Sequence, residues 1–299
     1  MIFFAGKEKT EDLLDQAMSY LEKGQPKVAI PLFKKIVKQE PKNTTALYNQ
    51  GLALNQLKKY QDAITCFDKV IEINPDDVGS INNRGISLAE LGNTDDAFEY
   101  YNKAIEIDPK YAAAHYNKGV LYDKLLQHEE AIESLDEALK CDSGNVNTAF
   151  YRGIVFGKMK KHEQALNCFE NIIRKHPKHM DAFFHKGIEL AELGKHEKAI
   201  DIFDKLLQIH GNNVNVIYAI ARSNAAMGNI DKALYLLEQA IKKDRKTIKK
   251  WAIEDEFFDS LLDEPKFQKL VKWNYKTFFL IPSILIRRTF FLGPINLAS

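Results

Sequence analysis

The chain has little cysteine and almost no net charge for its 299 residues. Its three cysteines, Cys66, Cys141 and Cys168, are odd in number and form no CxxC pair, which argues against a disulfide framework and fits a reducing compartment. The 42 basic residues are balanced by 41 acidic ones, so the sequence lacks the positive field that nucleic-acid binding requires. The apolar start at residues 1–6 is too short for a signal peptide. We therefore expect a cytoplasmic protein that does not bind nucleic acid.

The sequence also lacks the common signatures of catalysis. It contains no glycine-rich phosphate loop, no GxSxG and no HExxH. His128, His162 and His196 recur at a fixed spacing, but equivalent positions of stacked repeats lie roughly 10 Å apart and cannot share one metal ion. We expect a protein that is not an enzyme and that needs neither a cofactor nor a metal.

What the sequence does contain is a repeat with a period of 34 residues. A glycine recurs at this period, an alanine replaces it at both ends, and a second alanine follows 12 residues later each time. A fixed period of this length is typical of stacked structural repeats. The first column is Gly51, Gly85, Gly119, Gly153 and Gly187, with Ala17 and Ala221 at its ends; the second is Ala29, Ala63, Ala97, Ala131, Ala165, Ala199 and Ala233.

Each repeat is predicted to form two helices joined by a short turn. Apolar residues that follow the alanine by 1, 4, 7 and 8 positions form the stripe of a second helix, and those that follow the glycine by 3 and 6 mark a first helix. Proline ends the second helix in four repeats, while Ser143 and Gly211 take its place in two others. The seven repeats are expected at 10–43, 44–77, 78–111, 112–145, 146–179, 180–213 and 214–247.

This pattern resembles the tetratricopeptide repeat family, and the resemblance covers about 80% of the chain. It implies an all-α fold, a right-handed solenoid of stacked helix-turn-helix repeats with a C-terminal capping helix and a concave groove lined by the first helices. We expect an N-terminal lead at 1–9, the repeats at 10–247, a cap at 248–273 and a basic, hydrophobic tail at 274–299.

The resemblance also implies that residues two and three positions before the glycine face the groove. Three asparagines share the first of these registers, and a carboxamide can bond an extended peptide backbone because it donates and accepts at once. Alternatively, the asparagines bond neighbouring helices and the aromatic residues belong to the core. The predicted peptide-binding residues are Asn49, Asn83, Asn117, Tyr48, Tyr116, Phe150, Tyr151, Phe184 and His185.

A row of basic residues precedes the glycine directly, at Arg84, Lys118, Arg152 and Lys186. These side chains either attract acidic segments or form a solvated edge. The expected function is that of a non-enzymatic scaffold or adaptor, which binds an extended peptide or a helix of another protein in its concave groove.

The tail at 274–299 has basic residues, an apolar run at 278–286 and no acidic residue. The run is too short to span a bilayer, which needs about 20 apolar residues. Three uses stay open: return to the groove of its own chain or of a second copy, which would be self-association; disorder; and contact with an anionic membrane surface. The alternative function is therefore a scaffold that the tail anchors at a membrane surface.

Overall fold

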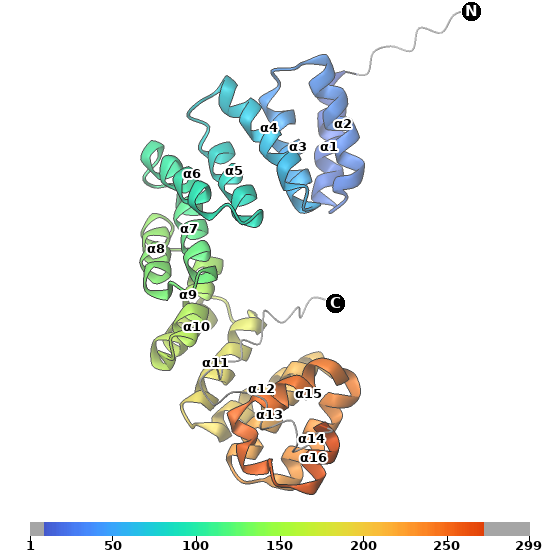
Figure 1. Cartoon of the computed structure of the whole chain (residues 1–299), viewed down its shortest axis with the longest axis vertical. Helices are drawn as coiled ribbons and strands as arrows, with labels where there is room; N and C mark the ends of the chain where they lie inside the picture. The colour runs from blue at the N-terminus through green and yellow to red at the C-terminus, as the bar shows by residue number, and fades with distance from the viewer. Residues whose placement is uncertain (1–8, 272–299) are drawn as a thin grey trace, which may run out of the picture. The chain divides into compact units, whose positions relative to one another are not determined.

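The computed structural model describes residues 9–271, and all regular structure in that range is helical (Figure 1). The predicted tail at 274–299 lies outside the described residues, as does the predicted lead apart from residue 9. The helices are α1 (Thr10–Glu22), α2 (Pro26–Gln39), α3 (Thr44–Gln56), α4 (Tyr60–Ile73), α5 (Val78–Glu90), α6 (Thr94–Ile107), α7 (Ala112–Lys124), α8 (His128–Cys141), α9 (Val146–Lys158), α10 (His162–Lys175), α11 (Met180–Glu192), α12 (His196–His210), α13 (Val214–Ala226), α14 (Ile230–Lys243), α15 (Arg245–Glu254), η1 (Glu256–Leu261) and α16 (Pro265–Val271).

The chain divides into two compact units, residues 1–145 and residues 146–299, here called unit 1 and unit 2. Unit 1 contains four helical hairpins, from α1/α2 to α7/α8. Unit 2 contains three hairpins, from α9/α10 to α13/α14, followed by α15, η1 and α16. Within each unit the helices of the hairpins pack on the next in order, and the first helices of successive hairpins also contact each other. After α14, helix α15 packs on α14, η1 packs on α13, and α16 packs on α14 and α15. The predicted all-α fold of stacked hairpins with a C-terminal capping helix is confirmed.

The glycine column lets the two helices of a hairpin approach closely because it leaves room for a large side chain of the second helix, which is a ring at every glycine of the column except Gly119. A Cβ atom at Gly51 would lie 2.6 Å from Cε1 of Phe67, and one at Gly187 would lie 2.5 Å from Cε1 of Phe203. Both rings are fully buried. The first helix therefore approaches the second closely, and the aromatic side chain fills the space that a larger residue would occupy.

The end of unit 2 departs from the repeat. Arg245 replaces the proline of earlier repeats, and Asp244 caps the next helix directly by accepting a hydrogen bond from the amide of Thr247 at 3.0 Å. Helix α15 therefore begins at Arg245 and crosses the boundary expected at 247. Phe258 and Phe267 then complete a core with α13 and α14. Within residues 9–271 no helix is both long and apolar enough to cross a membrane.

Candidate functional site

The three predicted peptide-binding asparagines, Asn49, Asn83 and Asn117, lie in register on α3, α5 and α7 of unit 1, and we call them the asparagine ladder. Asn49 is 8% exposed and donates to the carbonyl of Thr45 at 2.9 Å. Asn83 is half-buried and donates to the carbonyl of Gly79 at 2.8 Å and to the hydroxyl of Tyr48 at 3.0 Å. Each amide group is thus held by the protein itself, on its own helix or from the preceding hairpin.

The third asparagine follows the same rule with a different partner. Asn117 donates to Oδ1 of Asn82 at 2.9 Å, across from α7 to α5. The carbonyl partners of Asn49 and Asn83 can only accept, so they fix which end of each carboxamide faces inward. No residue in the described part of the chain donates to the Oδ1 atom of Asn49, Asn83 or Asn117. The acceptor oxygens of the ladder therefore have no donor among the described residues.

Tyr48 connects the first helices of two hairpins. Its ring lies edge-on to Phe67, with centroids 6.0 Å apart, and a Cβ atom at Gly79 would lie 3.4 Å from the ring. Burial is the main cause that raises the pKa of Tyr48 above its usual value, and the carboxylate of Asp77 raises it further. Tyr48 therefore stays neutral at physiological pH, and its hydroxyl accepts from Asn83. Half-buried Tyr116, whose pKa burial also raises, occupies the same register on α7.

An aliphatic row runs beside the asparagines, three residues further along each helix. A spacing of three places both sets on one face of the helix. Leu52, Ile86 and Val120 are all half-buried, so part of each side chain remains exposed. The first helices of unit 1 therefore carry polar acceptors next to aliphatic surface.

The predicted basic row is paired with the preceding second helix rather than left free for acidic segments. Arg84 forms an ion pair with Asp68 of α4, and its guanidinium lies 4.0 Å from the ring centroid of Tyr100. Lys118 donates to Oδ1 of Asn102 on α6 at 2.9 Å. In unit 2, Lys186 of α11 lies 2.8 Å from Glu170 of α10. These side chains join consecutive hairpins.

In unit 2 the predicted aromatic residues pack mainly on each other. His185 is 5% exposed and lies among Phe150, Phe169 and Phe184, with ring centroids 5.3–5.5 Å away. Burial lowers the pKa of His185 to about 4. Phe184 is 0% exposed and packs on Phe203. The structure thus places both side chains in the core, His185 against the rings of the preceding hairpin and Phe184 against Phe203 of its own hairpin.

Phe150 and Tyr151 keep more of their surface. Both are half-buried on α9. Phe150 also stacks on His179, with centroids 5.3 Å apart, and the ammonium of Lys158 lies 5.9 Å from the ring of Tyr151. Of the unit 2 candidates, these two have side chains that a partner could contact.

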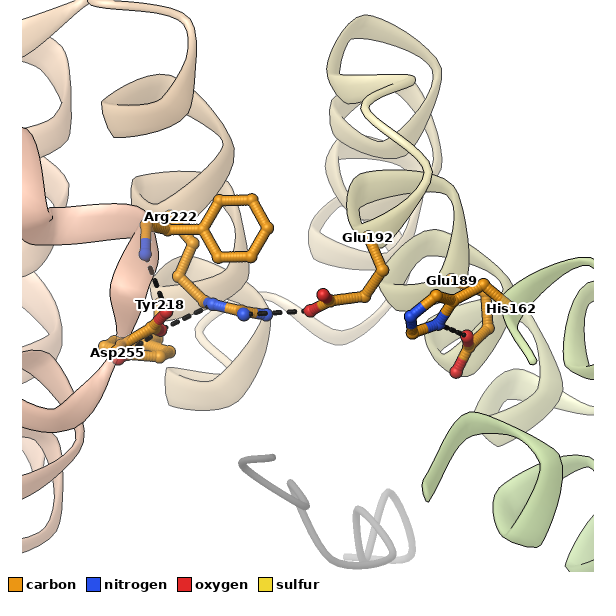
Figure 2. A network of polar contacts seen from close by, with 7 residues as sticks. His162, Glu189, Glu192, Tyr218, Arg222 and Asp255 are labelled. Carbon is orange, nitrogen blue, oxygen red and sulfur yellow. Dashed lines mark hydrogen bonds and ion pairs between the residues drawn. The ribbon is translucent and has the colours of Figure 1, made fainter. Parts of the chain in front are cut away.

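Unit 2 also contains a polar network that the sequence analysis missed (Figure 2). Arg222 of α13 is buried between two carboxylates, an ion pair with Asp255 and a hydrogen bond of 3.0 Å to Glu192. Tyr218 donates to the same Asp255 at 2.8 Å. Phe257 covers the guanidinium, with its ring centroid 4.3 Å away. The network fastens the cap to the first helix of the last hairpin.

A second, partly buried pair lies on neighbouring helices of unit 2. Nδ1 of His162, the first residue of α10, lies 2.8 Å from Oε2 of Glu189 on α11 (Figure 2). The hydrogen bond to Glu189 raises the pKa of His162, while burial raises the pKa of Glu189. A Cβ atom at Gly157 would lie 2.7 Å from Oε1 of Glu189, so this glycine makes room for the carboxylate.

The other periodic histidines have different partners. Nδ1 of His128 lies 3.1 Å from Asp123, and His196 stands edge-on to Phe257 with centroids 5.7 Å apart. Among the described residues, no group of three histidine, cysteine or acidic side chains is arranged to hold a metal ion.

Tetratricopeptide repeat models match the sequence over most of its length. One model matches residues 14–78 and 152–214, and others match 66–99, 87–125, 112–145 and 190–252. The chain belongs to the tetratricopeptide repeat family.

Solved structures of the same family resemble the fold. A tetratricopeptide repeat protein from Parabacteroides merdae is 19% identical, with a TM-score of 0.60 over 88% of this chain and 99% of that chain. YrrB, a TPR protein with an unusual peptide-binding site, is 26% identical, with a TM-score of 0.52 over 60% and 93%. TTC0263 of Thermus thermophilus is 18% identical, with a TM-score of 0.54 over 61% and 100%. Among curated proteins, none matches the chain significantly.

Proposed function

We propose that this protein is a non-enzymatic interaction scaffold that holds an extended segment of another protein along the first helices of unit 1. Asn49, Asn83 and Asn117 bond the backbone of the segment, and Tyr116 contacts its side chains. The likeness to YrrB, which has a peptide-binding site, supports this class of function. In unit 2, Phe150 and Tyr151 are proposed as a separate contact surface for a partner.

The proposal rests chiefly on the side-chain oxygens of the asparagines, which accept no hydrogen bond from the described residues. Asn83 and Asn117 are half-buried, their amide groups are fixed by bonds to the preceding hairpin, and their Oδ1 atoms accept nothing from the described residues. An extended segment offers backbone N–H groups that need acceptors. Preordered acceptors bind such groups at a low entropic cost, because the side chains that carry them are already immobilised.

Photocrosslinking tests where the partner binds. Benzoylphenylalanine is incorporated in cells in place of Tyr116, on the proposed face, or in place of Tyr235, an exposed tyrosine on the second helix α14. The crosslinked partner is identified by mass spectrometry. We expect adducts from position 116 and few from position 235; adducts from position 235 alone would place the partner elsewhere.

Direct binding of the identified segment then tests the asparagines. The double variant Asn83→Ala, Asn117→Ala should weaken the complex by about 10-fold, the effect of losing one to two hydrogen bonds. The matched control, Asn167→Ala with Asn171→Ala, removes two exposed asparagines of α10 and should leave the affinity within about twofold. Circular dichroism confirms that both variants are folded.

The membrane-surface alternative depends on the tail at 274–299, whose sequence is basic and apolar. Sedimentation with anionic vesicles compares the full chain with a chain that ends at residue 273. Equal pelleting of the two proteins would exclude the tail as an anchor.

A further inference from the structure

The ladder of unit 1 continues onto α1 with a carboxylate. Asp15 occupies in α1 the register that Asn49, Asn83 and Asn117 occupy in α3, α5 and α7. Its side chain is exposed, and no residue in the range 9–271 bonds to it. We call these four residues the acceptor row. It places one oxygen-bearing side chain on each hairpin of unit 1.

The row offers more acceptors than donors. Asn83 uses both of its amide hydrogens within the protein, and Asn49 and Asn117 each use one. The row can therefore offer a partner two amide hydrogens as donors. As acceptors it can offer three carboxamide oxygens and the two carboxylate oxygens of Asp15. A bound segment must supply mostly donors to satisfy these groups.

The charges of the same helices point to the same kind of partner. Helix α1 carries the exposed acids Glu11, Asp12, Asp15 and Glu22 and no basic residue. Helix α3 has no charged residue at all. No free cation on these helices would attract an acidic segment, since the lysines and arginines of α5 and α7 already contact protein oxygens.

Helices α5 and α7 together carry three lysine and arginine residues, and each contacts an oxygen atom of the protein. Arg84 pairs with Asp68, Lys118 bonds Asn102, and Lys124 pairs with Glu90. The Glu90 carboxylate also accepts from the hydroxyl of Tyr60 at 3.3 Å, and the hydrogen bond from Lys124 lowers the pKa of Glu90.

We infer that unit 1 binds a basic segment, whose lysine and arginine side chains reach the acceptor row while its backbone amides bond the asparagines. This inference rests on the proposed function and names the chemistry of its partner. Lysine and arginine are donor-only groups, so they satisfy carboxylate and carboxamide oxygens without needing donors in return. An acidic segment would meet unoccupied acceptors and like charge, both of which oppose binding.

A selection from random 12-residue peptides displayed on phage tests the inference with the full chain as bait. We expect enriched peptides to hold more lysine and arginine than aspartate and glutamate. Synthetic, labelled copies then give dissociation constants by fluorescence anisotropy at low and high salt. Affinity should fall as salt rises, because the attraction is between exposed charges.

Three variants separate the row from the acidic surface elsewhere. Asp15→Lys should weaken binding by about 2–5-fold, the effect of one exposed ion pair. Glu133→Lys makes the same charge change at an exposed position of the second helix α8 and should change binding less than about 1.5-fold. Asn117→Asp should tighten binding by about 2–5-fold, since Asn82 can turn its amide to donate to the new carboxylate.

The outcomes distinguish the two proposals. Enriched peptides that are neutral or acidic, and that lose affinity in the Asn83→Ala, Asn117→Ala variant, would overturn the basic-partner inference and leave the proposed function intact. Equal losses in Asp15→Lys and Glu133→Lys would also overturn it, because the attraction would then not come from the row. Enrichment that is the same on the wild type and on the double alanine variant would overturn the proposed function itself.

Discussion

Asp255, in the connection between α15 and η1, forms an ion pair with Arg222 of α13, and both side chains are buried. The pair joins the last hairpin to the segment that follows it. Asp255 also caps η1 by accepting from the amide of Phe257 at 3.2 Å. One carboxylate thus starts the 3-10 helix and holds it on α13.

Replacing Arg222 with methionine should destabilise unit 2 by about 3–5 kcal/mol, because the buried carboxylate of Asp255 and the half-buried carboxylate of Glu192 lose their cation. Adding Asp255→Leu should recover part of the loss by removing one of these charges. Urea unfolding measures both, and hydrogen exchange of residues 245–271 shows whether the cap opens first.

The control for this prediction is an exposed pair. Lys242 and Glu238 lie 2.9 Å apart on α14 with exposed side chains. Lys242→Ala should cost less than about 0.5 kcal/mol. If Arg222→Met lowered the free energy of unfolding as little as this control does, the buried network would not contribute to stability.

Replacing Glu189 with glutamine should lower the pKa of His162. The hydrogen bond to Glu189 is the largest cause of the raised pKa of this histidine, and a neutral amide stabilises imidazolium less than a carboxylate does. An NMR titration of the His162 ring follows the change. Glu163→Gln removes an exposed acid next to His162 in sequence and serves as the control; an equal decrease in both variants would contradict the assignment to Glu189.

Unit 2 should lose stability in acid because of His185. Burial holds the pKa of His185 at about 4, below the ordinary value of about 6.5, so at intermediate pH the unfolded chain binds a proton that the folded chain does not. The contribution of neutral His185 is complete above about pH 6.5 and is lost progressively as the pH falls to about 4. The loss should reach about 3 kcal/mol.

Urea unfolding at pH 7 and pH 4.5 tests this prediction in the wild type and in His185→Phe. The phenylalanine variant lacks the titrating group, so its stability should change less between the two pH values. An identical pH dependence in both proteins would show that His185 is not the source of the acid sensitivity.

The fold could be predicted because its cause is periodic. In each hairpin a small residue such as Gly187 faces a large side chain such as Phe203. This packing requirement makes the same pair of residue types recur every 34 residues in the sequence. The asparagines also recur at this period, but their hydrogen-bond partners differ from one repeat to the next. Which way each carboxamide points depends on Gly79, Tyr48 and Asn82, and spacing alone does not reveal such partners.

The unit 2 network was missed because its residues break the repeat rather than follow it. The position after the small residue is aliphatic at Leu52, Ile86 and Val120 but charged at Arg222. Glu189 likewise stands where other repeats have small or apolar residues. A charge in an otherwise apolar column needs a buried partner, and that signal could have pointed to the network. Its partner Asp255 lies beyond the repeats, where no periodicity applies.

Adding a methyl group at Gly187 should destabilise its hairpin by about 1–2 kcal/mol. The new Cβ would lie 2.5 Å from the buried ring of Phe203, and the overpacking outweighs the gain of about 1 kcal/mol that alanine brings to a helix. Adding Phe203→Leu should relieve the clash, as the pairing of Ala221 with Leu237 in the last hairpin indicates. A double-mutant cycle by urea unfolding gives the coupling energy. Gly144→Ala, whose Cβ meets only the side chain of Asp142 at 3.4 Å, is the control and should be nearly neutral.

Restoring the proline at position 143 should stabilise the turn after α8. Asp142 already has φ −136° and ψ 88°, close to the −131° and 95° of Asp108, which precedes Pro109 in the previous hairpin. Ser143→Pro therefore fits the native backbone and should raise stability by about 0.4–1 kcal/mol, chiefly by restricting the unfolded chain. Amide exchange in the wild type should be faster next to Ser143 than in residues 44–111, whose two hairpins end at proline, and the substitution should slow it.

Gly211 provides the opposite case at the equivalent end of α12. Its φ is +64°, a value that proline cannot adopt. Gly211→Pro should therefore destabilise the protein, although it also places proline at the position where other repeats have it. Thermal unfolding of the two proline variants compares them directly. Stabilisation by both, or by neither, would mean that backbone conformation does not decide where this family's proline is tolerated.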